Sequence, residues 1–458
     1  LAVSSENKSS QSAMSGGQYS VMSSPAVSLA EFNALKAIYN SSGGVGWSNK
    51  VGWTTAGSPP DVSGWYGITV DAAGHVVELN LSNNNLVGTL STAISGLTYL
   101  KTLNVDGNNL TGSIPTTLGT LTGLNQLILS NNDFRNGIPY QIGSLTNILY
   151  LNISNNPLLG GSIPTQLGNL SQLQALLLTY SNLSGGIPSS LRYLTSLSVL
   201  YLTGNELAGA IFSQINQMSS LRILQLGDNN LSGAIPATLL STPHLEELSL
   251  YENQFTGSIP NGATVFTELK AFVAYGSGLS GEIPGWFGNQ KSLNTFNIAY
   301  NNFSGELPSG LMGEGSYKLE FRTNNNSNLT GKLPEKVSAV SGLVDISNCN
   351  FSFYDFVSVY KSFSGSTFTY APQGLVDVAK NSSERIGFAF DFVAEVDREF
   401  SVPFPNARYK WYKLVNGNEV LMQDSSPRSN YRYTTPFLTD PDYGTYFYTI
   451  THSDAPLL

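Results

Sequence analysis

The stretch LNVDGNNLTGSIPTTLGTL, residues 103–121, indicates the fold, because near-copies of it recur along most of the chain. Aligned on their leucines, the copies begin at Val76, Leu100, Leu124, Ile148, Leu173, Leu197, Leu221, Leu245, Leu269 and Leu293. Eight of the nine intervals are 24 residues long, and the ninth is 25 residues, where Gly160-Gly161 supplies the extra residue. A fixed period of this length is typical of a repeat architecture in which each copy packs against its neighbours.

Each copy has the form LxxLxLxxNxLxGxIPxxLxxL. The LxL segment alternates with a period of two, which predicts a short strand with one buried face. One copy cannot bury its own apolar residues, so the copies must stack, with each strand hydrogen-bonded to the next at a spacing of ~4.8 Å. The sequence therefore predicts a one-dimensional stack of coils.

Polar and small residues at fixed places in the copy predict how each coil turns. The ninth position holds Asn84, Asn108, Asn132, Asn156, Asn205, Asn229, Asn253 and Asn301, with Ser181 and Ser277 in two copies. At that position the chain leaves the sheet, and a side-chain amide can pair backbone groups stranded inside the coil. Gly then permits the tight bend, and Ile-Pro fixes an extended segment on the opposite side. We interpret all of these residues as structural.

The copy resembles the plant-type leucine-rich repeat, and LxGxIP is specific for that subclass. The resemblance covers residues 76–351, including two degenerate copies, LEFRTNNNSNLTGKLP (319–334) and LVDISNCNF (343–351). It implies a curved solenoid of α/β type with about twelve repeats and a parallel sheet on its concave face. Cys349 takes the Asn position of the last copy, so we interpret it as a buried ladder residue and not as a nucleophile.

The segment 27–75 is expected to cap the first repeat, because the apolar end of a strand stack needs a cover. Ser28 and Glu31 predict a capping box that opens a helix LAEFNALKAIYN (29–40) with one apolar face. The tryptophans that follow, Trp65 among them, resemble the amino-terminal cap of plant-type repeats. Thr69 stands where that family usually has Cys, so packing must replace a disulfide.

The ends of the chain differ from the repeats in composition. Residues 1–26 are rich in Ser, Gly and Gln and are expected to form a flexible leader or tether, and 352–382 a carboxyl-terminal cap and linker. Residues 383–458 are β-rich, with a hairpin signal at Asn416-Gly417, and resemble an immunoglobulin-like β-sandwich with Trp411 in its core and Tyr446 as a tyrosine corner. The chain stops where a last strand is expected, which suggests that this domain is truncated.

Composition narrows the partners and the location. Only 12% of the residues are charged, the net charge is −9 and the pI about 4.9, so a nucleic acid backbone is repelled. No apolar run reaches the ~18 residues of a transmembrane helix. The single cysteine allows no intrachain disulfide, which favours a bacterial exported protein over a eukaryotic one. Repeats followed by such a β-domain also resemble exported surface proteins of Bacteroidetes-type bacteria, so we expect a secreted or cell-surface protein whose export signal is absent.

No constellation for catalysis is evident. His75, His244 and His452 lie far apart in a stacked fold, so neither a Ser/His/Asp arrangement nor a His-rich metal site is expected. No phosphate-binding glycine pattern occurs, and no cofactor is expected. A pair among the 31 acidic residues could still meet as in glycoside hydrolases, but we expect a non-enzymatic protein.

The candidate ligand-binding residues are those at positions 3, 5, 7 and 8 of each copy, which point outward from the concave face. Tyrosines with acidic residues among them gather on the middle repeats: Tyr150, Tyr180, Tyr201, Asp228, Glu247, Tyr251, Glu252, Tyr275 and Tyr300. We expect the tyrosines to form an irregular aromatic track across neighbouring strands. The alternative is that tyrosine merely favours strands and covers the sheet.

A tyrosine offers an apolar ring face and a hydroxyl, which suit either a protein hot spot or the CH face of a sugar ring. The carboxylates beside them could accept hydrogen bonds from sugar hydroxyls or meet a basic peptide. The leading hypothesis is therefore an adhesion or binding protein that recognises a protein partner through the concave face. A glycan ligand is the first alternative and a structural surface spacer the second, whereas the irregular side chains disfavour ice binding.

Overall fold

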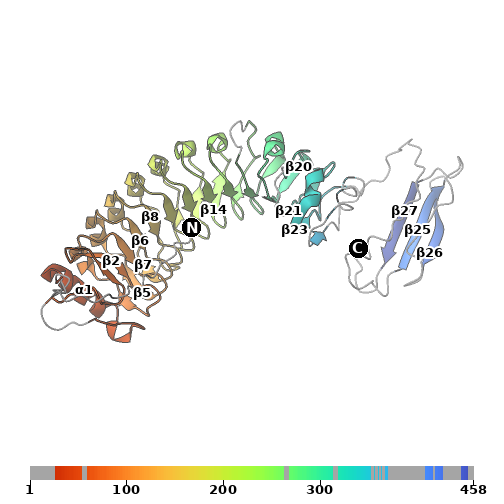
Figure 1. Ribbon diagram of the computed structural model, residues 1–458. Helices are drawn as coiled ribbons and strands as arrows, with labels where there is room; N and C mark the ends of the chain where they lie inside the picture. The colour runs from red at the N-terminus through yellow and green to blue at the C-terminus, as the bar shows by residue number, and fades with distance from the viewer. Residues whose placement is uncertain are drawn as a thin grey trace, which may run out of the picture.

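The computed structural model describes residues 26–53, 59–262, 268–312 and 318–351, residues 355, 359 and 363, and the strands at 367–369, 408–415, 418–425 and 445–451. The expected tether at 1–26 lies outside the described residues except for its last residue. Most of the expected immunoglobulin-like domain also lies outside them. Figure 1 shows the repeats as an arc of stacked coils, with the helical turns along its outer edge.

One 14-stranded sheet runs the length of the stack. Its strands, in spatial order, are β1 (Ile68–Val70), β2 (Val76–Asn80), β4 (Thr102–Asn104), β6 (Gln126–Ile128), β8 (Tyr150–Asn152), β9 (Ala175–Leu177), β11 (Val199–Tyr201), β13 (Ile223–Gln225), β15 (Glu247–Ser249), β17 (Ala271–Val273), β19 (Thr295–Asn297), β21 (Lys318–Arg322), β23 (Val340–Asp345) and β24 (Thr367–Thr369). β1 is antiparallel to β2, and the following pairs are parallel. The order of the strands follows the chain, as the repeat period predicts.

The register is in phase from repeat to repeat. Leu103 pairs with Leu127, and further along Leu200 pairs with Leu224, so equivalent leucines lie side by side. These leucines are at most 1% exposed, while their neighbours on the strands are half-buried or exposed. The period-two alternation therefore has its expected effect, with one face of the sheet inside the coils and the other on the concave surface.

The asparagines of the ninth position form the expected internal ladder. The Oδ1 atom of Asn108 accepts hydrogen bonds from the backbone N–H groups of Asn84 (3.1 Å) and Leu86 (2.9 Å) in the preceding repeat. Its Nδ2 atom donates to the carbonyl oxygens of Leu81 and Val105, both at 2.9 Å. One amide thus joins two successive coils. In Ser181 the hydroxyl still donates to the carbonyl of Ile153 at 3.0 Å, so a serine at this position continues the ladder.

The rest of each coil consists of short side strands and single 3₁₀ turns. The side strands form three parallel sheets: β3 (Val87–Thr89), β5 (Asn109–Ser113) and β7 (Asp133–Arg135); β10 (Ser184–Gly185), β12 (Glu206–Gly209), β14 (Asn230–Gly233) and β16 (Gln254–Phe255); β18 (Ser280–Glu282), β20 (Asn302–Glu306) and β22 (Asn328–Thr330). The turns are η2 (Thr92–Gly96), η3 (Thr116–Thr120), η4 (Tyr140–Ser144), η5 (Thr165–Asn169), η6 (Ser189–Tyr193), η7 (Ile215–Gln217), η8 (Ala237–Ser241), η9 (Gly285–Asn289) and η10 (Glu335–Ala339). The proline of the Ile-Pro pair comes directly before most of these turns, in an extended conformation.

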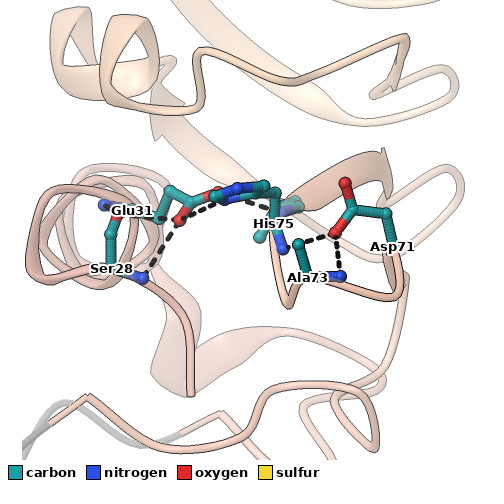
Figure 2. Close-up of polar contacts among 6 residues, drawn as sticks. Ser28, Glu31, Asp71, Ala73 and His75 are labelled. Atoms are coloured by element: carbon teal, nitrogen blue, oxygen red, sulfur yellow. Dashed lines mark hydrogen bonds and ion pairs between the residues drawn. The ribbon is translucent and has the colours of Figure 1, made fainter. Parts of the chain in front are cut away.

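The amino-terminal cap begins with α1 (Leu29–Ser41), opened by the expected capping box. Glu31 is 1% exposed, and its carboxylate accepts hydrogen bonds from the N–H (3.1 Å) and the hydroxyl (2.7 Å) of Ser28. The same carboxylate accepts from the N–H of Val76, the first residue of β2, at 2.9 Å, and lies 3.7 Å from Nδ1 of His75 (Figure 2). One buried side chain therefore starts the helix and also ties it to the first repeat.

Aromatic packing holds the remainder of the cap. After α1, the chain passes through η1 (Gly44–Gly46) to Trp47, whose ring meets that of Trp53 with centroids 4.8 Å apart. Trp53 in turn packs on Trp65 at 5.1 Å, and Trp65 reaches Phe32 of α1 at 6.3 Å. This aromatic cluster provides the packing expected to replace a disulfide in the cap, since Thr69 stands where the family usually has Cys.

At the other end, the sheet continues past the recognisable repeats. Cys349 is fully buried, and its thiol donates to the carbonyl of Thr323 at 3.1 Å, as a ladder asparagine would. β24 then adds one more parallel strand beside β23, within the segment interpreted as the carboxyl-terminal cap. No helix in the described parts of the chain has the length and apolar character needed to cross a bilayer.

A separate three-stranded antiparallel sheet follows, with β25 (Arg408–Val415) between β26 (Asn418–Ser425) and β27 (Thr445–Thr451). Val415 pairs with Asn418, so the strands predicted on either side of Asn416-Gly417 pair with each other in antiparallel fashion. In the same sheet Trp411 pairs with Tyr448. The rest of the region expected to form an immunoglobulin-like sandwich lies outside the described residues.

Candidate binding site on the concave face

Three of the nine candidate residues lie on the strands of the sheet, in two rows. Positions 3 form one row, in which Tyr150 pairs with Ala175 and Glu247 with Ile223. Positions 5 form the second row, in which Tyr201 pairs with Gln225. Positions 7 and 8 lie just beyond the strands, where the coil bends away. Tyr251 and Tyr275 occupy position 7, and Tyr180, Asp228, Glu252 and Tyr300 occupy position 8.

Position 8 has a left-handed backbone. In several repeats it is an asparagine or a glycine, such as Asn131 (φ 53°) or Gly204 (φ 71°), which tolerate this conformation. Three larger candidates adopt it without that tolerance, namely Tyr180 (φ 50°), Glu252 (φ 47°) and Tyr300 (φ 56°), and Asp228 (φ 55°) adopts it as a residue that tolerates it. For a bulky side chain this is an uncommon conformation that costs of order 1 kcal/mol. The middle repeats therefore depart from the favoured residue where their side chains face outward.

Two glycines make room for two of the tyrosine rings. A Cβ atom on Gly204 would lie 2.2 Å and 2.3 Å from two atoms of the Tyr180 ring. A Cβ atom on Gly227 would lie between 2.3 and 2.6 Å from three consecutive atoms of the Tyr251 ring. Distances this similar mean that each glycine lies under a ring face. Both rings therefore extend over a neighbouring repeat instead of standing upright above their own.

Tyr251 lies near Tyr180 and stacks on Tyr275. The Tyr251 ring stacks on the Tyr275 ring with centroids 4.8 Å apart and planes within 8° of parallel. Burial, the charges of neighbouring groups and a side-chain hydrogen bond with Tyr180 together raise the pKa of the Tyr251 phenol to about 12. Tyr180, Tyr251 and Tyr275 form one contact group, the tyrosine cluster, which spans the repeats of β9 to β17.

Two carboxylates adjoin the tyrosine cluster. Burial raises the pKa of the Tyr275 phenol, and the negative charges of Glu252 and Asp228 raise it further. Glu252 extends over Gly276, where an added Cβ would lie 3.0 Å from its Oε1 atom. Asp228 and Glu252 are both exposed, so their charges face the solvent above the concave surface.

The remaining candidates separate into a second group and one outlying residue. Burial raises the pKa of the Tyr201 phenol, and the charge of Glu247, followed by Tyr150, adds to this effect. Tyr150, Tyr201 and Glu247 thus share the part of the sheet beside the tyrosine cluster. Tyr300 is 62% exposed and stacks on no other ring within the described part of the chain. The expected single track is therefore two groups and an isolated tyrosine.

Sequence reasoning missed the glycines beneath the rings. Gly204 and Gly227 contribute no side chain, so an inspection of the outward residues passes over them. Their signal was nevertheless present, since each stands at an outward position one repeat away from a tyrosine at a similar position. A small residue beside a large one on adjacent parallel strands favours a ring that leans across the gap.

The candidate carboxylates on the concave face have no ion-pair partner among the described residues, unlike the neighbouring Glu246. Glu246, which precedes β15, pairs with Arg222 and, at 2.7 Å, with Lys270, and these charges lower the pKa of its carboxyl group. In the part of the chain that the structure describes, Asp228, Glu247 and Glu252 form no ion pair. The outward positions from β8 to β19 include no Lys or Arg. The middle of the concave face is thus aromatic and acidic.

Comparison with known families identifies the repeats. Models of the leucine rich repeat match residues 74–134, 147–170, 244–264 and 292–313. The search of curated proteins found no match. The chain thus contains leucine-rich repeats, and the fold is a leucine-rich-repeat solenoid.

Solved structures with similar folds include plant receptors. One is the ectodomain of the receptor kinase GASSHO1/SCHENGEN3 from Arabidopsis thaliana in complex with CASPARIAN STRIP INTEGRITY FACTOR 2, with 27% identity, a TM-score of 0.62, and coverage of 74% of this chain and 44% of that one. Another is PEPR1 with AtPEP1, with 27% identity, a TM-score of 0.61, and coverage of 74% and 51%. The chain therefore spans about half the length of these receptor chains.

A third similar structure is a plant ice-binding protein, with 21% identity, a TM-score of 0.54, and coverage of 78% of this chain and all of that one. At this level of identity the likeness concerns the fold. The similarity to all three proteins lies in the solenoid, and the plant receptors support the assignment of the repeats to the plant type.

Proposed function

We propose that this leucine-rich-repeat protein is an extracellular, non-enzymatic binding protein that holds a protein or peptide partner on its concave face. The observation that carries the proposal is the tyrosine cluster, in which Tyr180 reaches across Gly204 to a stacked Tyr251–Tyr275 pair. Rigid, partly buried tyrosines of this kind are enriched at the centres of protein interfaces, because they offer a large contact area at a low cost in conformational entropy.

Two further points support a binding role over mere coverage of the sheet. Tyr180 adopts a left-handed backbone and is 50% exposed, so neither backbone preference nor burial explains a tyrosine there. The plant receptors with similar folds were solved with a named factor and with AtPEP1. By this analogy we infer a protein or peptide partner and a location outside the cell.

The test is a selection of displayed random peptides on three purified proteins. These are the wild type, the double variant Tyr251→Ala/Tyr275→Ala, and a control, Tyr140→Ala/Tyr193→Ala, which removes two exposed tyrosines of the 3₁₀ turns η4 and η6. We expect the wild type and the control to enrich the same peptides and the cluster variant to lose them. Equal enrichment by all three proteins would place the site elsewhere.

A glycan array probed with the same three proteins covers the second candidate. The observation that favours it is the half-exposed ring face of Tyr180, which could stack on a sugar. Glycan binding that depends on Tyr180 and Tyr251, with no peptide enrichment, would replace the proposal. Binding to neither probe would leave a structural spacer.

A further inference from the structure

We propose that the partner segment carries arginine, and that its guanidinium group lies over the exposed ring of Tyr180 and pairs with Asp228, while Glu252 adds to the negative charge of the site. This inference rests on the proposed function and specifies the chemistry of the partner. The occupant is an extended peptide segment of another protein.

The first reason is charge. Asp228 and Glu252 are exposed carboxylates without an ion-pair partner in the described residues, and Glu247 carries a third charge on the same strands. Other carboxylates on or next to the strands of this sheet have cations, as Glu246 has Lys270 at 2.7 Å and Glu320 has Arg322 at 2.7 Å. Arg322 of β21 acts on Tyr275 but pairs with Glu320, so Asp228 and Glu252 have no cation of their own and a cationic partner would supply one.

The second reason is desolvation. A partner that covers the tyrosine cluster also removes water from the adjacent carboxylates, and burying a charge without a partner is strongly unfavourable. A neutral segment would leave that cost in place, whereas a cation converts it into an attractive contact. Hence the acids select a positively charged partner.

The third reason is ring geometry, and it favours arginine over lysine. Gly227 underlies one face of the Tyr251 ring and Tyr275 covers the other, so this ring acts as a support. Tyr180 has Gly204 under one face and is half exposed, which leaves its other face open. A planar guanidinium can stack on that face and donate two parallel N–H groups in its own plane to a carboxylate, whereas an ammonium group has no such planar fork and is more strongly hydrated.

The decisive variant is Asp228→Asn/Glu252→Gln, which removes two charges and keeps the shapes. Both sites have a left-handed backbone, and asparagine tolerates it at least as well as aspartate, so the fold should persist. The control is Glu282→Gln/Glu306→Gln, which makes the same charge change at two exposed residues of the side strands β18 and β20. Thermal unfolding of both variants verifies that they fold.

The experiment sequences the peptides that each protein enriches from the random library and measures the affinity of the strongest peptide. We expect arginine to be enriched on the wild type and the control, and the affinity to fall roughly tenfold or more in Asp228→Asn/Glu252→Gln and on replacing the peptide arginine by glutamine. Replacement by lysine should weaken binding less. Enriched peptides without arginine, bound equally by the charge variant, would overturn the inference and leave the proposed function standing. No enrichment on the wild type would overturn both.

Discussion

The stacked rings of Tyr251 and Tyr275, 4.8 Å apart and within 8° of parallel, join two repeats on the concave face. Their separation matches the ~4.8 Å spacing of neighbouring strands, so the solenoid itself sets the stack. The surface that a partner contacts is therefore formed before the partner binds. This pre-organisation lowers the entropic cost of binding.

The space over Gly227 provides a way to move Tyr251 without removing it. Gly227→Ala places a Cβ atom 2.3 Å from the ring, so the ring must leave its place. We expect peptide binding to weaken roughly as much as in Tyr251→Ala, while the repeats remain folded. The affinity of a selected peptide measures this. Gly285→Ala serves as the control because a Cβ atom there meets no neighbour within 4 Å, and equal losses in the two variants would argue against a role for the ring position.

The Tyr251 phenol should titrate late. Its pKa is raised from the ordinary value of 10.0 to about 12, so the folded protein keeps this proton where the unfolded chain releases it. Between pH 10 and 12 the unfolded state therefore binds fewer protons, and the free energy of unfolding falls as the pH rises. Phenolate absorbance of the wild type minus that of Tyr251→Phe should show a single transition near 12. A difference curve centred near 10 would mean that this phenol is neither buried nor bonded.

Replacing the strained tyrosine outside the cluster should make the protein more stable. Tyr300 has a φ of 56° and is 62% exposed, so Tyr300→Asn relieves the backbone with little loss of packing. We expect the free energy of unfolding to rise by about 0.5–1 kcal/mol. Tyr193→Asn, in which an exposed tyrosine of ordinary backbone changes in the same way, should produce no gain. Urea unfolding of both variants measures the difference, and a loss of stability in Tyr300→Asn would show that the ring has partners.

Substitution of an asparagine of the internal ladder should lower stability, whereas substitution of the asparagine next to it in sequence should not. Asn229 is 8% exposed, donates to the carbonyls of Leu202 and Leu226 at 3.0 and 3.1 Å, and accepts from the N–H of Leu207 at 3.1 Å. Asn229→Ala leaves these buried groups unpaired and should cost roughly 2 to 4 kcal/mol of unfolding free energy. The adjacent Asn230→Ala, at an exposed side-strand position, should change stability by less than about 0.5 kcal/mol.

The single thiol should be inert in the native protein. Cys349 is fully buried, and burial raises its pKa to about 11. At pH 8 we expect a thiol reagent such as dithionitrobenzoate to react with the native chain far more slowly than with the chain unfolded in urea. Because this is the chain's one cysteine, the signal has a single source. Rapid reaction of the native protein would contradict its place in the ladder.

The sequence was sufficient for the solenoid because each repeat restates the same local physics. The buried leucines, the Asn ladder and the capping box at Glu31 all follow from residue type and spacing, and the structure confirms them. The place of Cys349 in the ladder was predictable for the same reason, because Cys349 occupies the Asn position of the last repeat.

The contacts among the outward tyrosines were not predictable in the same way. The repeat assigns Tyr180 and Tyr251 to outward positions three repeats apart, and nothing in the period says that they meet. They meet because Gly204 and Gly227 leave space between them and because Tyr180 leaves the strand with a left-handed backbone. Side-chain direction at such a bend depends on the neighbouring repeats, which is a property of the assembled surface.

The most direct measurement is the affinity of the strongest selected peptide, determined by calorimetry for the wild type, Tyr251→Ala/Tyr275→Ala and the Tyr140→Ala/Tyr193→Ala control. If the partner binds on the tyrosine cluster, the cluster variant should lose at least roughly a hundredfold in affinity, because each central tyrosine contributes of order 2 kcal/mol. The control should bind like the wild type. Equal affinities for all three proteins would contradict a binding site on the concave face.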